Sequence, residues 1–447
     1  MQDLARQLSD ICGVRRLRQD PVQQTTNKRG FGVYCKGDMD TGIINMEIEE
    51  ALKRILDRIE PGRLKRQIPL TEACGAVLAE NIIAERNVPS FPRSAMDGYA
   101  VHSAEVMEAS RRSAVSLRVT EELAAGDVSS PDADHGEGTA VRIMTGACVP
   151  DQYDAVVRQE DTDCGNETVE IYAGVKAYQN YCKAGEDIAE GTLVIGRGKK
   201  LTAAHLSLIA ELGYSEVLTY APARIALIST GSELLDVGTE PEPGKIYNSI
   251  AYLLQAAVRQ KGLEVESYGI CPDEEDKLKR MLEKALDTAD FIITTGGVSV
   301  GKRDIVPSVL KSMGGMMLFQ YADIQPGTPT TAFTIGNKVV LSLSGNPYAA
   351  LANFELYFWD SMAKFMHCDE LRPVCRIAEM SGNYEKKNLH RRLLRAFYDD
   401  GVVKLIDNIH ASSVIRNLTE CNCFIDLEAG RTVKTGDKVR VRLFNYL

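Results

Sequence analysis

The chain has 447 residues, of which 44% are hydrophobic, and carries a formal net charge of -10 at pH 7. Single hydrophobic cores stop growing at roughly 250–300 residues, so this length predicts about three or four domains. The negative charge argues against nucleic acid or an anionic membrane as the main partner, and the sequence has no apolar run of the roughly 18 residues that a membrane-spanning helix needs.

Residues 1–45 form an N-terminal extension of unknown role. They are rich in Gln, Arg and Gly and carry no sustained hydrophobic period, which predicts a partly disordered segment. They also lack a continuous apolar segment of signal-peptide length, so we expect a cytoplasmic protein.

Eleven cysteines raise the question of disulfides or a metal cluster. They are scattered along the chain and no Cys-x-x-Cys pair occurs, so a structural zinc site has weak support. We favour the other interpretation, in which they are reduced and act as small hydrophobic residues in a cytosolic protein.

Two helices are predicted on either side of a long insertion. Apolar residues recur at helical spacing between Met46 and Ile59, and Pro61-Gly62 ends this pattern. The second helix is predicted over Ala203–Leu212, where Gly213 ends it. We expect the two helices to pack near each other and to enclose the segment between them as an inserted domain.

Short β-like runs dominate both this insertion and the C-terminal end of the chain. Ala140–Met144 and Asp154–Arg158 are two such runs, and turn residues separate them, so the insertion is predicted to be a small β-rich domain. After Pro373 short strands return, and Asp437–Leu443 alternates strictly between polar and apolar residues. This C-terminal pattern predicts a small β-barrel or sandwich.

Between these parts, strand and helix patterns alternate in the order typical of a three-layer α/β domain with a mostly parallel sheet. The predicted strands are Arg224–Ser229, Val265–Ile270, Phe291–Thr294 and Lys338–Leu343, and helices are predicted around 249–261, around 275–288, from Asp304 onward and around 347–364. The predicted boundaries are 1–45 for the extension, 46–74 with 186–217 for a discontinuous helical and linking domain, 75–185 for the β-rich insertion, 218–367 for the α/β domain and 368–447 for the C-terminal β domain.

Three glycine-bearing loops, 229–234, 294–301 and 343–347, follow predicted strands of the α/β domain. Phe291–Asp304 is the most informative stretch of the chain, because a buried apolar run breaks there into three glycines, two hydroxyls and a carboxylate. Glycines let backbone N–H groups approach an anion, and loops after parallel strands converge on one edge of a sheet. Any one loop is typical of an ordinary turn, whereas three together predict a site for an anionic small molecule.

Carboxylates accompany these loops. Glu233, Asp273 and Asp304 each lie just past a predicted strand, and Gly185-Glu-Asp187 in the insertion supplies a further pair. Clustered carboxylates around a phosphate site need a cation such as Mg²⁺, because like charges repel. Helix capping stays open as the alternative, particularly for Asp273 and Asp304.

These segments, in this order, resemble the molybdopterin molybdenumtransferase family, which includes bacterial MoeA and the E domain of gephyrin. The resemblance covers about 400 residues from Met46 to the C-terminus and leaves the extension outside. Its motifs are Val88–Val101, Arg142–Ala147 with Asp154–Val157, Gly185–Ile188, Ser229–Leu234, Thr295–Gly301 with Asp304, Gln325–Pro329 and Ser344–Pro347.

The resemblance implies an elongated homodimer of four-domain subunits, with a MogA-like α/β domain similar to that of the adenylyltransferase acting just before these enzymes. It implies adenylyl-molybdopterin and molybdate as substrates, molybdenum cofactor and AMP as products, and Mg²⁺ as the cation. The implied partners are the upstream molybdopterin adenylyltransferase and the recipient molybdoenzymes. Two other functions stay open, a catalytically weakened paralogue that binds molybdopterin or molybdate as a carrier or scaffold, and a tungstate-preferring transferase.

The resemblance also implies roles for individual residues. Asp187, Glu233, Asp273 and Asp304 take the catalytic role, and three of them, Asp187, Asp273 and Asp304, the metal. The implied cofactor-binding residues are Thr145, Gly231, Ser232, Ser249, Gly296, Gly297, Val298, Ser299, Gly301, Pro326, Gly327, Gly345, Asn346 and Pro347.

Several positions depart from the family pattern. The lysines usual at Gln325 and Thr328 are absent, and a usual arginine is Cys182. A usual Asp-x-Asn is Asn248-Ser-Ile250, and a usual Pro-Gly-Asn-Pro begins with Ser344. Each lost cation costs about 1.5–3 kcal/mol of binding if it removes a charged hydrogen bond to the anion. Lys302 or Arg303 would compensate, unless both are solvated surface charges.

Overall fold

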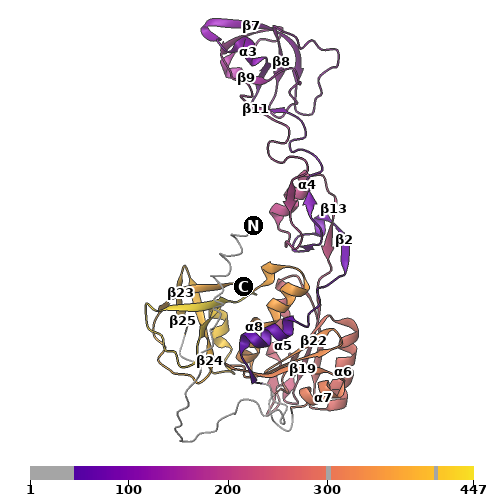
Figure 1. Cartoon of the computed structure of the whole chain (residues 1–447), viewed down its shortest axis with the longest axis vertical. Coiled ribbons are helices and arrows are strands. Elements are labelled where there is room, and N and C mark those ends of the chain that lie inside the picture. The colour runs from indigo at the N-terminus through magenta and orange to yellow at the C-terminus, as the bar shows by residue number, and fades with distance from the viewer. Residues whose placement is uncertain (1–44, 299–303, 407–410, 447) are drawn as a thin grey trace, which may run out of the picture. The chain divides into compact units, whose positions relative to one another are not determined.

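The computed structural model describes residues 45–298, 304–406 and 411–446 (Figure 1). The extension up to residue 44 and the predicted site residues Ser299 and Gly301, with Lys302 and Arg303, lie outside the described residues. None of the described helices is both long and apolar enough to cross a membrane.

A seven-stranded sheet forms the centre of the α/β part. Four neighbouring strands run parallel, β21 pairs antiparallel with both of its neighbours, and β1 runs parallel to β19. The mostly parallel sheet predicted from the sequence is therefore confirmed. In order across the sheet, the strands are β1 (Asn45–Met46), β19 (Met316–Ala322), β21 (Pro329–Ile335), β22 (Lys338–Leu343), β18 (Phe291–Thr295), β14 (Arg224–Thr230) and β17 (Glu264–Cys271).

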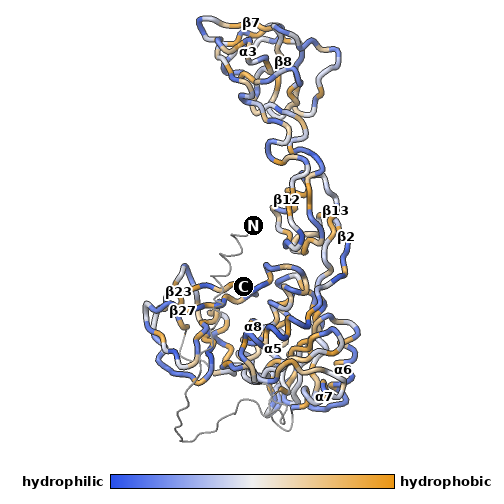
Figure 2. The backbone as a smooth tube through the Cα atoms, viewed as in Figure 1, coloured by the Kyte–Doolittle hydropathy of each residue, from blue (hydrophilic) through white to orange (hydrophobic). Residues whose placement is uncertain are grey.

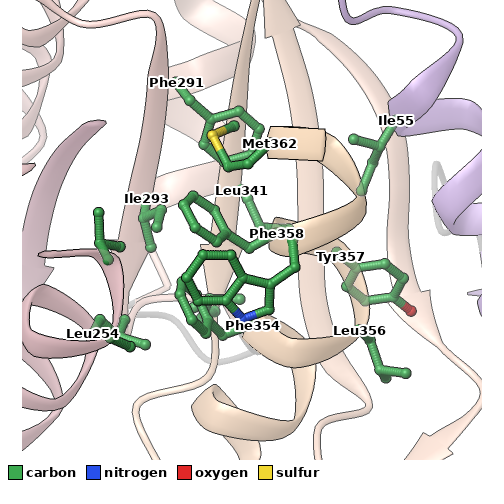
Figure 3. Packing of buried hydrophobic residues seen from close by; sticks show 14 of the residues in the cluster. Ile55, Leu254, Phe291, Ile293, Leu341, Phe354, Leu356, Tyr357, Phe358 and Met362 are labelled. Atoms are coloured by element: carbon green, nitrogen blue, oxygen red, sulfur yellow. The ribbon is translucent and has the colours of Figure 1, made fainter. Parts of the chain in front are cut away.

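Helices cover both faces of this sheet, which gives the three predicted layers. One face packs against α2 (Ile48–Leu56), α5 (Ser249–Gln260) and α8 (Pro347–Phe365). The other packs against α6 (Glu275–Thr288) and α7 (Val306–Ser312). Helix α8 is buried along almost its whole length, and its aromatic side chains fill the layer between α2, α5 and the strands (Figure 3). Hydrophobic stretches lie mostly inside this part and hydrophilic ones mostly around its rim, as Figure 2 shows.

The two helices expected to pack together lie in separate cores. Ile48, Ala51 and Ile55 of α2 belong to the cluster around α8. Ile209 of α4 (Ala203–Glu211) belongs to another cluster, which also contains Val217. Both helices present an apolar stripe, and a stripe shows that a face is buried without showing what covers it. The expectation of a direct contact was therefore wrong.

Helix α4 packs instead with a three-stranded sheet and one short strand pair. The sheet has the order β2 (Lys65–Pro69), β13 (Glu216–Tyr220), β3 (Val77–Leu78), and the pair is β4 (Ile82–Ile83) with β12 (Leu193–Ile195). A second pair, β5 (Arg93–Ser94) with β11 (Tyr181–Cys182), stands apart from this cluster. Short 3-10 helices cover Leu70–Glu72, Gln159–Asp161, Asp369–Leu371 and Arg416–Glu420.

The insertion is β-rich, as predicted. It contains a five-stranded sheet and one short helix, and its buried side chains form two hydrophobic clusters on the sheet. The sheet order is β10 (Thr168–Ala173), β7 (Ser110–Leu123), β8 (Thr139–Ile143), β6 (Gly98–Val101) and β9 (Ala155–Arg158), and the helix is α3 (Ser103–Val106).

The C-terminal strands close into a β-barrel rather than a sandwich. Strand β24 (Arg391–Asp399) pairs with both β25 (Val402–Leu405) and β26 (Cys423–Leu427), so the order β24-β25-β23-β27-β26 returns to its start. The remaining barrel strands are β23 (Cys375–Ser381) and β27 (Lys438–Leu443). A short strand from the α/β part, β20 (Ile324–Gln325), also pairs with β24 and thereby joins the two parts.

Candidate functional site

The three glycine loops meet at one edge of the parallel sheet. Strands β14, β17, β18 and β22 all end there, and their last residues are Thr230, Cys271, Thr295 and Leu343. The Gly231 N–H donates to the Cys271 carbonyl at 3.0 Å, and the Gly296 N–H donates to the Leu343 carbonyl at 2.9 Å. The loops after these strands are thus direct neighbours, as the strand order requires.

Gly296 and Gly297 are needed for this close approach. Both adopt positive φ angles, +84° and +62°. A Cβ added to Gly296 would lie 2.2 Å from the Thr230 carbonyl oxygen, and one on Gly345 would lie 3.5 Å from the Gly296 Cα. Backbone packed this tightly leaves peptide groups rather than side chains facing the edge, which suits an anionic ligand.

Three of the four predicted acidic residues, Glu233, Asp273 and Asp304, lie in the loops at this edge of the sheet. Asp273 does not cap α6, whose N-cap is Glu274. The Asp273 Oδ2 accepts from the Ser232 N–H at 3.4 Å, and the Asp273 N–H donates to Ser232 Oγ at 3.0 Å. Glu233 folds back over Gly231, where an added Cβ would lie 2.6 Å from its Oε2. Asp304 lies two residues before α7 begins. These three carboxylates thus follow strands that end at the same edge.

Asp187 and Thr145 lie on elements other than the glycine loops. The Asp187 N–H donates to the Val88 carbonyl at 3.1 Å. The N–H and Oγ1 of Thr145 both donate to Asp97 Oδ1 at 2.7 Å, and these bonds lower the pKa of Asp97. No group of three or more His, Cys, Asp or Glu side chains is gathered as a metal cluster in the described ranges. The metal set predicted from the sequence stays a prediction.

Asn248, one of the departures, has a structural role beside the glycine loops. It is buried, its Nδ2 donates to Ser229 Oγ at 2.9 Å, and that hydroxyl lies 3.2 Å from Asn248 Oδ1. The amide therefore ties the start of α5, and with it Ser249, to the end of β14. A carboxylate buried here would need compensation for its charge, which the neutral amide avoids.

A cleft of about 730 Å³ opens between the α/β edge and the barrel. Predicted residues Pro326, Gly327 and Asn346 line it, and Gly345 and Pro347 flank Asn346 in sequence. The complete lining is Gln325, Pro326, Gly327, Thr328, Pro329, Ser344, Asn346, Ala349, Tyr384, Lys386, Arg392, Ala411 and Ser412. Sequence reasoning missed the last five, which come from the C-terminal part.

Helix α8 holds both walls of the cleft. Its Asn353 Nδ2 donates to the Gly327 carbonyl at 2.9 Å and lies where a Cβ on Gly327 would be, at 2.4 Å. In the first turn, the Tyr348 N–H donates to the Ser412 carbonyl at 3.0 Å, and the Tyr348 hydroxyl donates to the Leu393 carbonyl. The loop Gln325–Pro329 and the barrel are therefore fixed relative to the N-terminus of one helix.

The cleft is electropositive. Among the described residues that line it, the only charged ones are Lys386, which is exposed, and Arg392, which is 6% exposed. The N-terminus of the 19-residue α8 adds the partial positive charge of the helix dipole. Two cations, a helix N-terminus and the hydroxyls of Ser344 and Ser412 form a site that fits an anion with several oxygens.

Comparisons with known proteins agree with this architecture. Three family models match the chain, "MoeA N-terminal region (domain I and II)" over residues 46–213, "Probable molybdopterin binding domain" over 226–364 and "MoeA C-terminal region (domain IV)" over 378–444. The cleft lies between residues of the second and third regions.

Relatives of known name match over most of their length. A molybdopterin molybdenumtransferase from Staphylococcus epidermidis is 34% identical over 403 residues, which is 89% of this chain and 95% of that protein. One from Bacillus subtilis is 33% identical over 404 residues, 89% of this chain and 93% of that protein. A solved structure of a molybdopterin biosynthesis MoeA protein from Pyrococcus horikoshii matches with a TM-score of 0.80 and 28% identity, over 89% of this chain and 99% of that one. The chain therefore belongs to the MoeA family of molybdopterin molybdenumtransferases.

Proposed function

We propose that this protein is a molybdopterin molybdenumtransferase of molybdenum cofactor biosynthesis, which takes adenylyl-molybdopterin and molybdate and releases molybdenum cofactor and AMP. The observation that carries the proposal is the electropositive cleft beside three convergent glycine loops. One ligand has to carry an organic pterin and phosphates, and the other is a small oxyanion. An edge of glycine backbone beside a cationic cleft has room and complementary charge for both.

In this proposal molybdate lies in the cleft. Arg392 and Lys386 balance its two negative charges, and the hydroxyls of Ser344 and Ser412 donate to its oxygens beside the positive end of the α8 dipole. The phosphates of the pterin substrate lie over the glycine loops, where Gly296 and Gly297 expose backbone N–H groups. The two ligands thereby meet at the carboxyl edge of the sheet.

Mg²⁺ fits the donor set at this edge. Glu233, Asp273 and Asp304 offer carboxylate oxygens, which this hard cation prefers over nitrogen or sulfur. When bound, the cation would neutralise phosphate charge next to these carboxylates. Within the protein itself, the Ser232 N–H donates to the Asp273 carboxylate, and Ser232 Oγ accepts from the Asp273 backbone N–H.

The decisive assay mixes the purified protein with adenylyl-molybdopterin, Mg²⁺ and micromolar molybdate and follows the release of AMP. Arg392→Gln should lower the rate while Arg392→Lys retains part of it, because the cleft needs a cation at this point. Arg376→Gln, an exposed arginine on β23 outside the cleft, is the matched control and should behave like the wild type. Parallel runs with tungstate measure which oxyanion the protein prefers.

A carrier or scaffold is the second candidate, and one observation favours it. The wall of the cleft formed by Gln325–Pro329 carries no charge, so it contributes less to anion activation than a lysine would. Intact binding of the pterin substrate without AMP release above background would select the carrier. The homodimer, the upstream adenylyltransferase and the recipient molybdoenzymes belong to the same proposal, and light scattering at micromolar concentration tests the homodimer.

A further inference from the structure

The loop between β23 and β24 presents Lys386 to the cleft in a fixed conformation. Asn388 closes this loop from inside. It is 7% exposed, and its Nδ2 donates to the Lys386 carbonyl at 3.1 Å and to the Tyr384 hydroxyl at 3.2 Å. The backbone carbonyl of Asn388 accepts from the Gly430 N–H at 2.8 Å. A buried amide with this many partners sets the course of the backbone on both sides of Lys386.

Both ends of the loop are tied down. At the barrel side, Tyr384 exchanges two backbone hydrogen bonds with Val433, at 2.8 and 3.0 Å. At the α/β side, His390 Nδ1 contacts Asp323 Oδ1 at 2.5 Å, immediately before β20 begins. The lysine thus stands on a loop anchored to both parts that form the cleft.

The wall of the cleft formed by Gln325–Pro329 supplies no charge. Gln325 is neutral, and the Thr328 hydroxyl is already used, because it donates to the Ile324 carbonyl at 2.6 Å. The charge of the cleft therefore comes entirely from the barrel wall among the described lining residues, through Arg392 and Lys386. Removing Lys386 would leave one positive side chain facing an anion with two negative charges.

We propose that Lys386 determines the cleft's preference for a tetrahedral dianion, and that Asn388 is the residue that positions it. This inference rests on the proposed function, since it assigns the second charge of the same oxyanion site. Loss of one cation leaves the second charge of a dianion unbalanced, so it weakens the binding of a dianion more than that of a monoanion of the same shape. Comparing the two kinds of anion therefore separates charge recognition from general packing.

The experiment measures direct binding of molybdate and of perrhenate, a tetrahedral monoanion, to four purified proteins: wild type, Lys386→Ala, Lys387→Ala and Asn388→Ala. Lys387 is the matched control, because it is the exposed neighbour with the same charge and does not line the cleft. Lys386→Ala should weaken molybdate binding about threefold to tenfold and perrhenate binding much less. This magnitude lies between those of a solvent-screened and a well-formed charged contact. Lys387→Ala should change neither anion, and Asn388→Ala should weaken molybdate by part of the Lys386→Ala effect.

A double variant keeps the test independent of folding. Lys386→Ala combined with Thr328→Lys moves the cation to the opposite wall and should restore molybdate binding, which a merely structural role for Lys386 would not allow. If the wild type, Lys386→Ala and Lys387→Ala all bind molybdate equally well, the inference is overturned while the proposed function stands. Molybdate binding that falls only in Lys386→Ala, in a protein that releases no AMP, supports the inference and rejects the transferase. A wild type that binds no molybdate overturns both.

Discussion

Glu355 is a fully buried carboxylate in the middle of α8, and its ionisation should be visible in the fluorescence of the chain's single tryptophan. Glu355 Oε1 accepts from Trp359 Nε1 at 2.9 Å, and Oε2 accepts from the Asn445 N–H at 3.1 Å. Burial raises the pKa of Glu355 to about 7, although these two hydrogen bonds and the charges of Arg442 and Lys261 act in the opposite direction.

The size of this effect follows from the shift. A rise from the ordinary value of 4.5 to about 7 corresponds to about 3 kcal/mol, because one pKa unit is about 1.4 kcal/mol. The unfolded chain loses the Glu355 proton near its ordinary pKa, whereas the folded protein keeps it up to about pH 7. Unfolding therefore releases a proton within this window. The contribution to stability is complete below the ordinary pKa and is lost as the pH rises through about 7.

The assay is a titration of the folded protein between about pH 5 and pH 9, followed by tryptophan emission and by thermal midpoints at each pH. We expect an emission transition near pH 7 in the wild type, retained in Glu283→Gln, an exposed control on α6, and absent from Glu355→Gln. The stability advantage of the wild type over Glu355→Gln should shrink across the same range. A transition that persists in Glu355→Gln would refute the reasoning that burial of this one carboxylate sets the midpoint.

The remaining predictions concern stability and use thermal or urea unfolding. Gly296→Ala should lower the free energy of unfolding by more than about 2 kcal/mol, because the φ angle of Gly296 is +84° and the new Cβ would lie 2.2 Å from a carbonyl oxygen. Gly314→Ala, at a φ angle of +78° with open space around the new Cβ, should lower it by only about 1 kcal/mol. Thr294→Val should be neutral or stabilise by up to about 1 kcal/mol, since its buried Oγ1 finds no partner among the described residues. Arg391→Met should cost about 3 kcal/mol, because it leaves the Asp426 carboxylate, 3% exposed, without its ion pair.

Much of the α/β part could be predicted because its elements are encoded locally. Phe291–Thr295 is buried at every position, so the strand is a continuous run of apolar and β-branched residues, and Gly296 marks its end. Helices α5 and α6 lie within a residue of their predicted ranges, because amphipathic spacing fixes both of their ends. Glycine loops after such strands also converge by necessity once the sheet is parallel.

The barrel's part in the cleft could not be predicted in the same way. The position of the barrel depends on the pairing of Ile324 and Gln325 with Arg391 and Arg392, and a pairing of two residues is too short to produce a periodic pattern in the sequence. Arg392 lies within a strand whose residues 392–396 are all buried, so nothing local marks it as part of a ligand site. The departures at Gln325 and Thr328 were visible in the sequence, whereas the cations that line the same cleft, Lys386 and Arg392, were not.

The cleft should keep its shape while Glu355 titrates, because α8 holds the C-terminal part at two separate places. Near the helix N-terminus, Tyr348 forms hydrogen bonds with the backbone carbonyls of Leu393 and Ser412, and about 10 Å along the helix Glu355 accepts a hydrogen bond from Asn445. Ionisation weakens protein stability because it places a charge in the buried surroundings of Glu355, and it leaves the contacts of Tyr348 unchanged. The ratio of KM for molybdate between wild type and Glu355→Gln should therefore stay constant across the pH range in which the thermal midpoints converge. A KM that rises near pH 7 in the wild type alone would show that the contact at Glu355, rather than the one at Tyr348, positions the cationic wall.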